Sequence, residues 1–385
     1  MIKQPFYTIT IFFLALACLL GCGQRKGPVT GAPDGQGPKI AHAKGFSIQK
    51  QGVLTILNVS APWPGAQKGF TYLLAPKEKL ATMRIAAGTY DAVVGTPVDK
   101  MVLTSTTHIP ALEALGTLES LVGFPDPDLI SSPVARSLVD NGQIKDLGMN
   151  EEINMEIVLS LSPEVVMGFG INDTNRAYET LQRAGIAVVY NGDWVEHSPL
   201  GKAEWIKFFA PFFQKEAEAD SIFSEIERAY GQAAELAKKA RRRPTVLTGG
   251  LYKDVWHVAG GESWFAQFLR DAQGDYLWAD SPGSGGIALG LEAVLVKAKE
   301  ADIWLNPSAH TSYAALAAAN PHHRQFRAFG NRKVYSNAKA KGEKGGVLFY
   351  ELAPQRPDLV LRDLIHILHP QLLPDHSLLF FKPLD

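Results

Sequence analysis

The stretch that decides the fold is the periodic segment Gln214 to Ala240, which reads QKEAEADSIFSEIERAYGQAAELAKKA. Its apolar residues recur at helical spacing, with glutamates and lysines between them, so the segment predicts an amphipathic helix. These apolar positions are Ala219, Ile222, Phe223, Ile226, Tyr230, Ala233, Ala237 and Ala240. At 1.5 Å per residue such a helix is about 40 Å long. A rod of this length, ended by Pro244, predicts a connector between two folded bodies.

Strands and helices alternate on both sides of this rod. Before it we expect strands at 101–104, 121–124, 165–168 and 187–190, and helices at 110–115, 154–160 and 174–184. After it we expect strands at 245–248, 303–305 and 333–336, and helices at 264–272, 291–298 and 357–368. This alternation is typical of mostly parallel sheets covered by helices. The sequence therefore predicts an α/β protein with two Rossmann-like lobes joined by one long α-helix.

An internal repeat indicates that the two lobes are related. The segment Asn154–Leu159 parallels Gly290–Leu295 at a constant offset of 136 residues. Each copy predicts a short helix followed by an apolar strand, with a glutamate (Glu156 or Glu292) in the first helical turn. A carboxylate there complements the helix dipole, which alone explains both residues. In the alternative interpretation, the two glutamate carboxylates, one on each lobe, dock onto a partner that presents two arginines.

Composition excludes several classes of protein. The 385 residues are 46% hydrophobic and 20% charged, a globular profile rather than a disordered one. A net charge of −1 argues against nucleic acid as a partner. The two cysteines, Cys18 and Cys22, lie near the N-terminus and leave the folded body without a cysteine-built metal site or disulfide framework. G-x-S-x-G, H-E-x-x-H and P-loop motifs do not occur, and the histidines are scattered. We therefore expect no enzyme, no resident cofactor and no bound metal.

The N-terminal residues predict export and lipidation. The apolar run 6–20 is too short to span a bilayer and is typical of a secretory signal, which we assign to residues 1–21. It ends in Leu19-Leu20-Gly21-Cys22, which resembles the bacterial lipoprotein cleavage box. Lipidated Cys22 would then be the only membrane attachment. Glycines and prolines fill residues 22–45, which we expect to be a flexible tether.

The remaining boundaries follow from these patterns. We predict an N-terminal lobe at 46–198, with a β-rich lead-in at 46–95, because residues 53–59 alternate in the manner of a strand. A helical connector occupies 199–243 and includes the linker helix 214–240, and a C-terminal lobe occupies 244–385.

The order of short segments along residues 95–370 resembles one protein family. In the first lobe these are Ala114-Leu115-Gly116, Leu121-Val122-Gly123, Asn154-Met155-Glu156, Ser162-Pro163-Glu164-Val165-Val166 and Leu181–Val189. In the second they are Gly260-Gly261-Glu262-Ser263-Trp264, Ala272-Gln273-Gly274, Leu291–Leu295, Asn331-Arg332-Lys333-Val334-Tyr335 and Arg356–Val360 with Ile367–Pro370. The chain resembles the substrate-binding proteins of ABC importers for iron–siderophore, haem and cobalamin.

The resemblance implies a function and its partners. A monomer on the periplasmic face of the cell envelope would hold a small metal chelate or cobalamin in a cleft between the lobes. It would deliver this cargo to an ABC permease dimer with its ATPase. The family's docking glutamates fall on Glu156 and Glu292. Two other functions stay open: an extracytoplasmic enzyme or chelatase on the same scaffold, and a scavenging lipoprotein without a permease.

Loops expected at such a cleft carry polar and flat side chains. The candidate cargo-binding residues are Thr106, His108, Asn150 and Trp194 in the first lobe, and Tyr252, Trp256, His257, Trp278 and Tyr350 in the second. Aromatic faces suit a planar or catecholate ligand, and His108, His257 or Tyr252 is of a type that ligates haem iron. Core positions are an equal alternative for Trp194, Tyr252, Trp256 and Trp278. Apolar patterns assign Trp205, Trp264 and Trp304 to the core.

Overall fold

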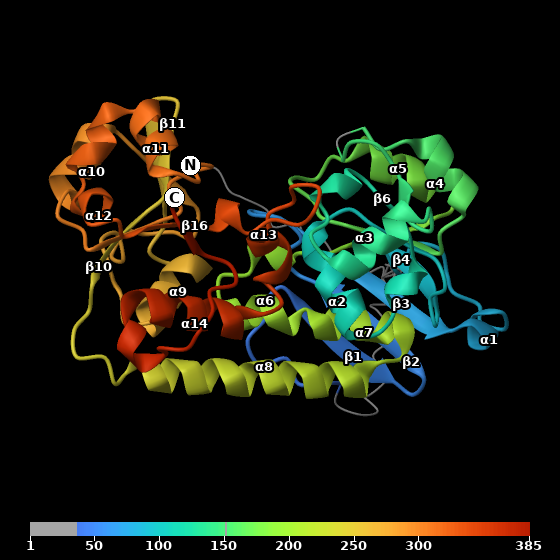
Figure 1. The fold of residues 1–385 in the computed structure, drawn as a ribbon. Helices are drawn as coiled ribbons and strands as arrows, with labels where there is room; N and C mark the ends of the chain where they lie inside the picture. Colours follow the sequence, from blue (N-terminus) through green and yellow to red (C-terminus); the bar gives the residue numbers. More distant parts are fainter. Residues whose placement is uncertain (1–36, 151) are drawn as a thin grey trace, which may run out of the picture. The chain divides into compact units, whose positions relative to one another are not determined.

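The computed structural model describes residues 37–150 and 152–385 (Figure 1). The predicted signal peptide, Cys22 and most of the predicted tether lie outside these residues. Within them, no helix combines the length and the apolar composition needed to cross a membrane.

The N-terminal lobe is built on a five-stranded parallel sheet. Its strands are β5 (Met101–Leu103), β6 (Leu121–Phe124), β7 (Lys145–Asp146), β8 (Val165–Gly168) and β9 (Ala187–Tyr190), in the order β7-β6-β5-β8-β9. The helices are α2 (Ile109–Ala114), α3 (Pro133–Asp140), α4 (Met155–Leu161) and α5 (Arg176–Arg183), with short 3-10 turns η1 (Thr106–His108), η2 (Leu118–Ser120) and η3 (Pro127–Leu129). The order reverses between β5 and β8, so the topological switch point lies at their carboxyl ends.

The lead-in forms a separate four-stranded sheet against this lobe. Strands β1 (Phe46–Gln51), β2 (Leu54–Val59) and β3 (Phe70–Pro76) are antiparallel, and β4 (Ala92–Thr96) pairs in parallel with β3. A short helix, α1 (Lys77–Leu80), lies between β3 and β4. Tyr72 joins the two sheets, because its hydroxyl accepts a hydrogen bond from the backbone N–H of Tyr190 at 2.9 Å.

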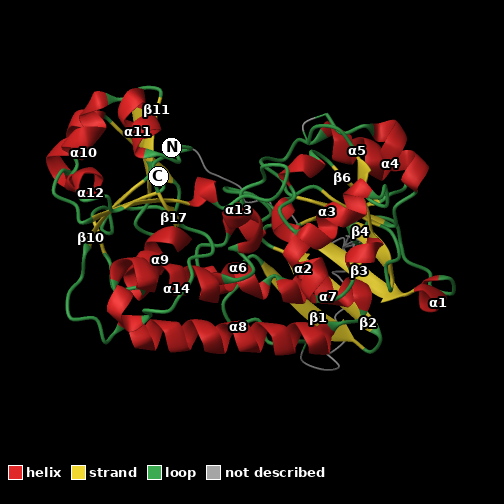
Figure 2. Cartoon of the chain, in the orientation of Figure 1, coloured by secondary structure: helices red, strands yellow, loops and turns green. Residues whose placement is uncertain are grey.

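The connector consists of α6 (Pro199–Glu204), α7 (Ile206–Phe213) and the linker helix α8 (Glu216–Ala237), which has 22 residues. Figure 2 shows α8 running past both lobes. Its first half places Ala219, Phe223 and Ile226 in the core of the N-terminal lobe. Its second half places Tyr230 and Ala237 in the core of the C-terminal lobe. The predicted long helix is therefore confirmed, and each half is held by a different core.

The C-terminal lobe repeats the α/β plan. Its main sheet has the order β13-β10-β15-β16-β17, from β10 (Thr245–Thr248), β13 (Asp275–Tyr276), β15 (Ile303–Leu305), β16 (Val334–Ser336) and β17 (Lys382–Pro383). The helices are α9 (Trp264–Asp271), α10 (Leu291–Ala298), α11 (Tyr313–Ala319), α12 (Arg327–Gly330), α13 (Leu348–Leu352) and α14 (Pro357–Leu368). A second, antiparallel sheet of β11 (Gly250–Tyr252), β12 (Val255–Ala259) and β14 (Gly286–Leu289) was not predicted.

The internal repeat is visible in the structure. Helices α4 and α10 start 136 residues apart, at Met155 and Leu291. Each helix precedes a strand that pairs with the first strand of its sheet: β8 pairs with β5, and β15 pairs with β10. The helix caps differ, because the Asn154 side chain accepts a hydrogen bond from the N–H of Ile157 at 3.1 Å, whereas Gly290 has no side chain to do so.

The predicted flexible tether is wrong over its last residues, because two buried carboxylates hold them. Glu204 accepts hydrogen bonds from the backbone N–H groups of Ala41, His42 and Ala43 at 2.7–2.9 Å. Glu196 accepts from those of Lys44 and Gly45 at 2.8 and 2.7 Å. The segment 41–45 is therefore part of the folded body.

Candidate functional site

The loops that follow the parallel strands of the N-terminal lobe meet the C-terminal lobe along one seam. After β5, the turn η1 packs against α13. After β6, the backbone N–H groups of Ser131 and Ser132 donate to the Glu351 carboxylate of α13. After β9, His197 lies 3.2 Å from the hydroxyl of Ser284. Ligands of open parallel sheets bind at the carboxyl ends of the strands, so this seam is the candidate binding cleft.

A buried lysine supports the middle of the seam. Lys202 of α6 donates hydrogen bonds to the backbone carbonyls of Asp193 and Trp194 at 2.9 and 3.0 Å. Its Nζ also lies 5.1 Å from the ring centroid of Trp264 in the C-terminal lobe. Burial lowers the pKa of Lys202, while the nearby carboxylates of Asp193 and Glu196 oppose that effect. Lys202 thereby fixes the turn that carries Trp194, whose side chain is 40% exposed.

His108 does not line the cleft, so its predicted role as a cargo residue is wrong. The residue is fully buried beside Phe209, with 5.5 Å between ring centroids. Its nearest charged group is Asp193, with Oδ1 3.9 Å from Nε2. Burial lowers the pKa of the imidazole, which is therefore neutral at pH 7. His108 immediately precedes α2, which has a proline in its first turn, as is common at helix N-termini. Its ring therefore lies at the start of a helix that packs in the core.

Two predicted tryptophans are also core residues. Trp256 is fully buried and stacks on Trp304, with 5.3 Å between ring centroids, and its indole N–H donates to the carbonyl of Thr248. Trp278 is 8% exposed, and the Nζ of Lys297 covers its ring at 5.3 Å. Successive side chains of a strand point to opposite faces of the sheet. In β12 the side chain of Trp256 therefore faces the core, whereas those of its neighbours Val255 and His257 are exposed.

The other candidate residues remain accessible in part. Thr106 is half-buried in η1, and Tyr350 is 62% exposed on α13, the element that η1 contacts. Together with Trp194 these side chains lie on elements of the seam. Tyr252 (65% exposed) and His257 lie instead on the β11–β12 hairpin. Asn150 is half-buried before α4, where its backbone N–H donates to Asp126.

Two hollows lie along the seam. The larger has a volume of about 420 Å³, and its lining comes from three parts of the chain. These are His42, Lys44, Gly45 and Ala61, then Gly192 and residues 195–198, and finally Glu262 and Gln267 of the C-terminal lobe. The smaller has a volume of about 290 Å³ and lies between α2, the start of α3 and α13. Pockets that hold small molecules typically measure 300–1,000 Å³, so the larger hollow has the size of a ligand site.

Glu351 is a seam residue without a distinctive sequence signal. Its side chain is buried, and its two oxygens accept from Ser131 and Ser132 at 2.6 and 2.7 Å. Burial raises the pKa of this carboxyl to about 7, although both backbone hydrogen bonds act in the opposite direction. The pairing joins residues 220 positions apart in the chain, which periodicity and motifs do not reveal.

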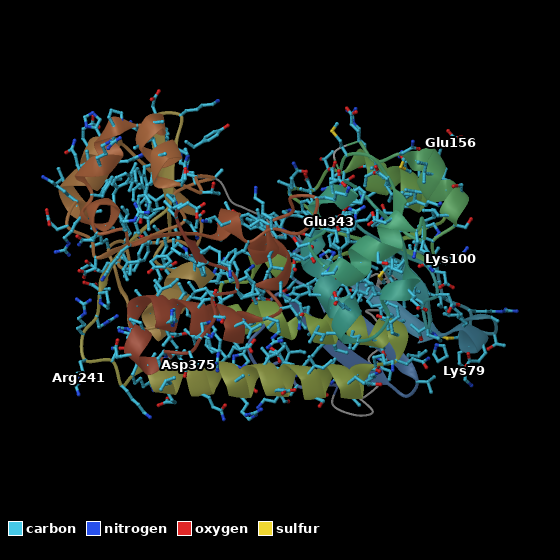
Figure 3. The ribbon with its side chains drawn as sticks, viewed as in Figure 1. Lys79, Lys100, Glu156, Arg241, Glu343 and Asp375 are labelled. Atoms are coloured by element: carbon cyan, nitrogen blue, oxygen red, sulfur yellow. The ribbon has the colours of Figure 1, made fainter. Side chains whose placement is uncertain are left out.

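The two predicted docking glutamates occupy equivalent places. Glu156 lies in the first turn of α4 and Glu292 in the first turn of α10, and both are exposed. Figure 3 shows Glu156 at the outer surface of the N-terminal lobe. Each therefore presents a carboxylate on its own lobe.

A family model described as periplasmic binding protein matches residues 101–339. The chain belongs to this family. The match covers the parallel sheet of the N-terminal lobe, the linker helix and the C-terminal lobe as far as residue 339; it begins after the four-stranded lead-in sheet and ends before α13, α14 and β17. The lead-in of this periplasmic binding protein therefore lies outside the matched part of the family.

Known proteins similar to this periplasmic binding protein agree with the fold. An uncharacterized lipoprotein of Methanocaldococcus jannaschii is 25% identical over 299 residues, covering 75% of this chain and 69% of the relative. A periplasmic haem-binding protein of Pseudomonas aeruginosa has a TM-score of 0.56 at 18% identity, covering 75% of this chain and 98% of its own. A possible iron-binding periplasmic protein of Staphylococcus epidermidis has a TM-score of 0.54 at 16% identity, covering 71% and 100%.

Proposed function

We propose that this periplasmic binding protein is the lipid-anchored, extracytoplasmic cargo-binding component of an ABC importer. Its cargo is an iron complex, either a siderophore or haem, or alternatively cobalamin. Capture involves no covalent chemistry. The protein holds the cargo between its lobes and releases it when a permease dimer, powered by its ATPase, separates them.

The observation that carries this proposal is the seam at the strand ends. Loops after β5, β6 and β9 of one doubly wound sheet meet elements of the other lobe. Helix α8 belongs to both cores and so joins the two lobes, and a hollow of about 420 Å³ lies along the seam between them. This arrangement suits capture of a bulky molecule.

Exposed aromatic side chains support the cargo class. Trp194 and Tyr350 are 40% and 62% exposed, on seam elements from opposite lobes. Large flat surfaces of this kind favour stacking against a planar or ring-rich ligand. Solved structures with this fold include proteins named as haem-binding, iron-binding and Fe³⁺-hydroxamate transport proteins, which supports the choice of metal chelates over sugars or amino acids.

The sequence and the relatives support the proposed location at the cell envelope. Cys22 of the lipoprotein-type box is the proposed anchor, and two of the Methanocaldococcus jannaschii relatives are named lipoproteins. Glu156 and Glu292 are the proposed contacts with the permease, since equivalent exposed carboxylates on two lobes match two equivalent cationic points on a dimer.

Tryptophan fluorescence tests the proposed cargo class. Trp194 is the most exposed of the seven tryptophans, all of which lie in the described part of the chain. We expect saturable quenching by at least one of haem, cobalamin and a panel of ferric siderophores. Trp194→Ala and Tyr350→Ala are expected to weaken binding of that ligand at least about tenfold, an amount that corresponds to the loss of one good stacking contact. Val296→Ala, which truncates an exposed side chain on α10, is the matched control. The proposal fails if none of the three ligand classes binds.

A further inference from the structure

The lobes are tied together on one side of the seam by a buried carboxylate. Glu351 projects from α13 of the C-terminal lobe and is 2% exposed. It accepts the backbone N–H groups of Ser131 and Ser132, at the N-terminus of α3 in the other lobe. Ser132 is fixed further, because its hydroxyl donates to Glu113 at 2.7 Å. The partners of Glu351 are backbone groups, which cannot rotate away as side chains can.

A glycine-rich loop makes a second contact beside Glu351. We call residues Lys341–Val347 the strap; an antiparallel bridge joins its two ends. A Cβ at Gly346 would lie 2.0 Å from the carbonyl oxygen of Leu129, and a Cβ at Gly342 would lie 2.6 Å from the Cα of Ser131. The strap therefore lies directly on the backbone of the N-terminal lobe, in contact that only glycine permits. Figure 3 labels Glu343, at the tip of the strap.

A further hydrogen bond across the seam, among the residues that the structure describes, is of a different kind. His197 and Ser284 are joined by one bond of 3.2 Å between exposed side chains. Water competes readily for such a bond, and its loss leaves no buried group unpaired. Separating Glu351 from α3 would instead break two hydrogen bonds to a buried side chain, together with the close packing of the strap on the backbone of residues 129–131, which costs more than the loss of one exposed bond. The two contacts are therefore unequal in how strongly they resist opening of the seam.

We propose that Glu351 and the strap form a fixed pivot between the lobes, about which the seam opens on the His197–Ser284 side. The lobes then rotate about this contact rather than separating as whole bodies. This inference concerns the motion of the lobes and does not depend on which cargo is bound.

Distances between spin labels on the two lobes test the pivot. Leu159 on α4 and Val296 on α10 are 45% and 89% exposed, and each is replaced by a labelled cysteine. The full chain, with Cys18→Ser and Cys22→Ser so that only the introduced cysteines react, is measured in detergent by pulsed electron paramagnetic resonance. The parent protein is expected to give a single narrow distance distribution.

Four variants test whether Glu351 and the strap, rather than neighbouring contacts, hold the two lobes in place. Glu351→Ala and Gly346→Ala are expected to broaden the distribution, whereas Glu343→Ala, an exposed change in the same strap, leaves it as in the parent. Ser284→Ala removes the hydrogen bond to His197 and is expected to broaden the distribution less than Glu351→Ala does. Equal or greater broadening by Ser284→Ala, or parent-like widths in both pivot variants, would overturn the proposal.

Hydrogen exchange provides a second readout on the same proteins. The amides of Ser131 and Ser132 are expected to exchange at least about tenfold faster in Glu351→Ala, since both lose their acceptor. Unchanged exchange of these amides in a folded variant also contradicts the pivot. If circular dichroism shows that Glu351→Ala does not fold, Glu351→Gln and Gly346→Ala give the same comparison with smaller changes in volume or charge.

Discussion

The raised pKa of Glu351 makes the stability of this protein depend on pH in a direction opposite to that of most carboxylates. The folded pKa is about 7, against an ordinary value of 4.5. The folded state therefore binds a proton more tightly than the unfolded state, so the stabilising contribution of this group is fully present below pH 4.5. It is lost as the pH rises towards 7. A pKa difference of about 2.5 corresponds to about 3 kcal/mol.

The assay compares the wild type with Glu351→Gln, which carries no titrating proton. Urea unfolding at several pH values gives the free energy of unfolding of each protein, and the difference between them removes contributions that both share. These shared contributions include the buried His108, whose lowered pKa gives a slope of the opposite sign. We expect the wild type to lose about 3 kcal/mol relative to the variant between pH 4.5 and pH 7. A difference that is flat, or that rises with pH, would refute the assignment of burial as the dominant effect on Glu351.

Three further predictions concern other residues. Glu204→Ala should lower the free energy of unfolding by about 3–5 kcal/mol and accelerate amide exchange in residues 41–43, because their N–H groups lose their acceptor. Unchanged exchange of these amides in the variant would contradict this role of the carboxylate. Trp256→Ala should cost about 3–5 kcal/mol, because it empties a core site, yet folded protein should keep its cargo affinity; a selective loss of affinity would place Trp256 in the cleft. The double variant Glu156→Arg and Glu292→Arg should bind cargo normally but fail to stimulate the ATPase of the permease, and normal stimulation would exclude both residues as docking contacts.

Much of the architecture was predictable because periodicity is a local property. Strands 121–124, 165–168, 187–190, 245–248 and 303–305, and the helices 291–298 and 357–368, have the bounds that the apolar patterns indicate. The linker helix was predicted three residues too long at its C-terminal end and two at its N-terminal end. Gln214 adopts a left-handed conformation that ends α7, so α8 begins at Glu216 instead. Such ends depend on single backbone angles, which propensity does not specify.

The candidate site was predictable only in part. Loops after the strands were identified from their order, but the same reasoning left Trp194, Tyr252, Trp256 and Trp278 undecided between cleft and core. Trp256 and Tyr252 lie on adjacent strands, yet one is fully buried and the other is 65% exposed. Which face of the small antiparallel sheet turns inward depends on how that sheet packs against Trp304 and its neighbours. That packing joins distant parts of the chain and has no local signature.

By itself, the sequence of this protein determined the α/β alternation, the long connecting helix, the repeat that pairs Glu156 with Glu292, and the lipoprotein-type box at Cys22. Hydrophobic spacing and short motifs encode these features within a few tens of residues. Only the tertiary structure decided which side chains reach the seam, that residues 41–45 are anchored by Glu196 and Glu204, and that Glu351 ties the lobes together. Each of these contacts joins groups more than 100 residues apart, and its strength comes from burial, which exists only once both lobes have packed.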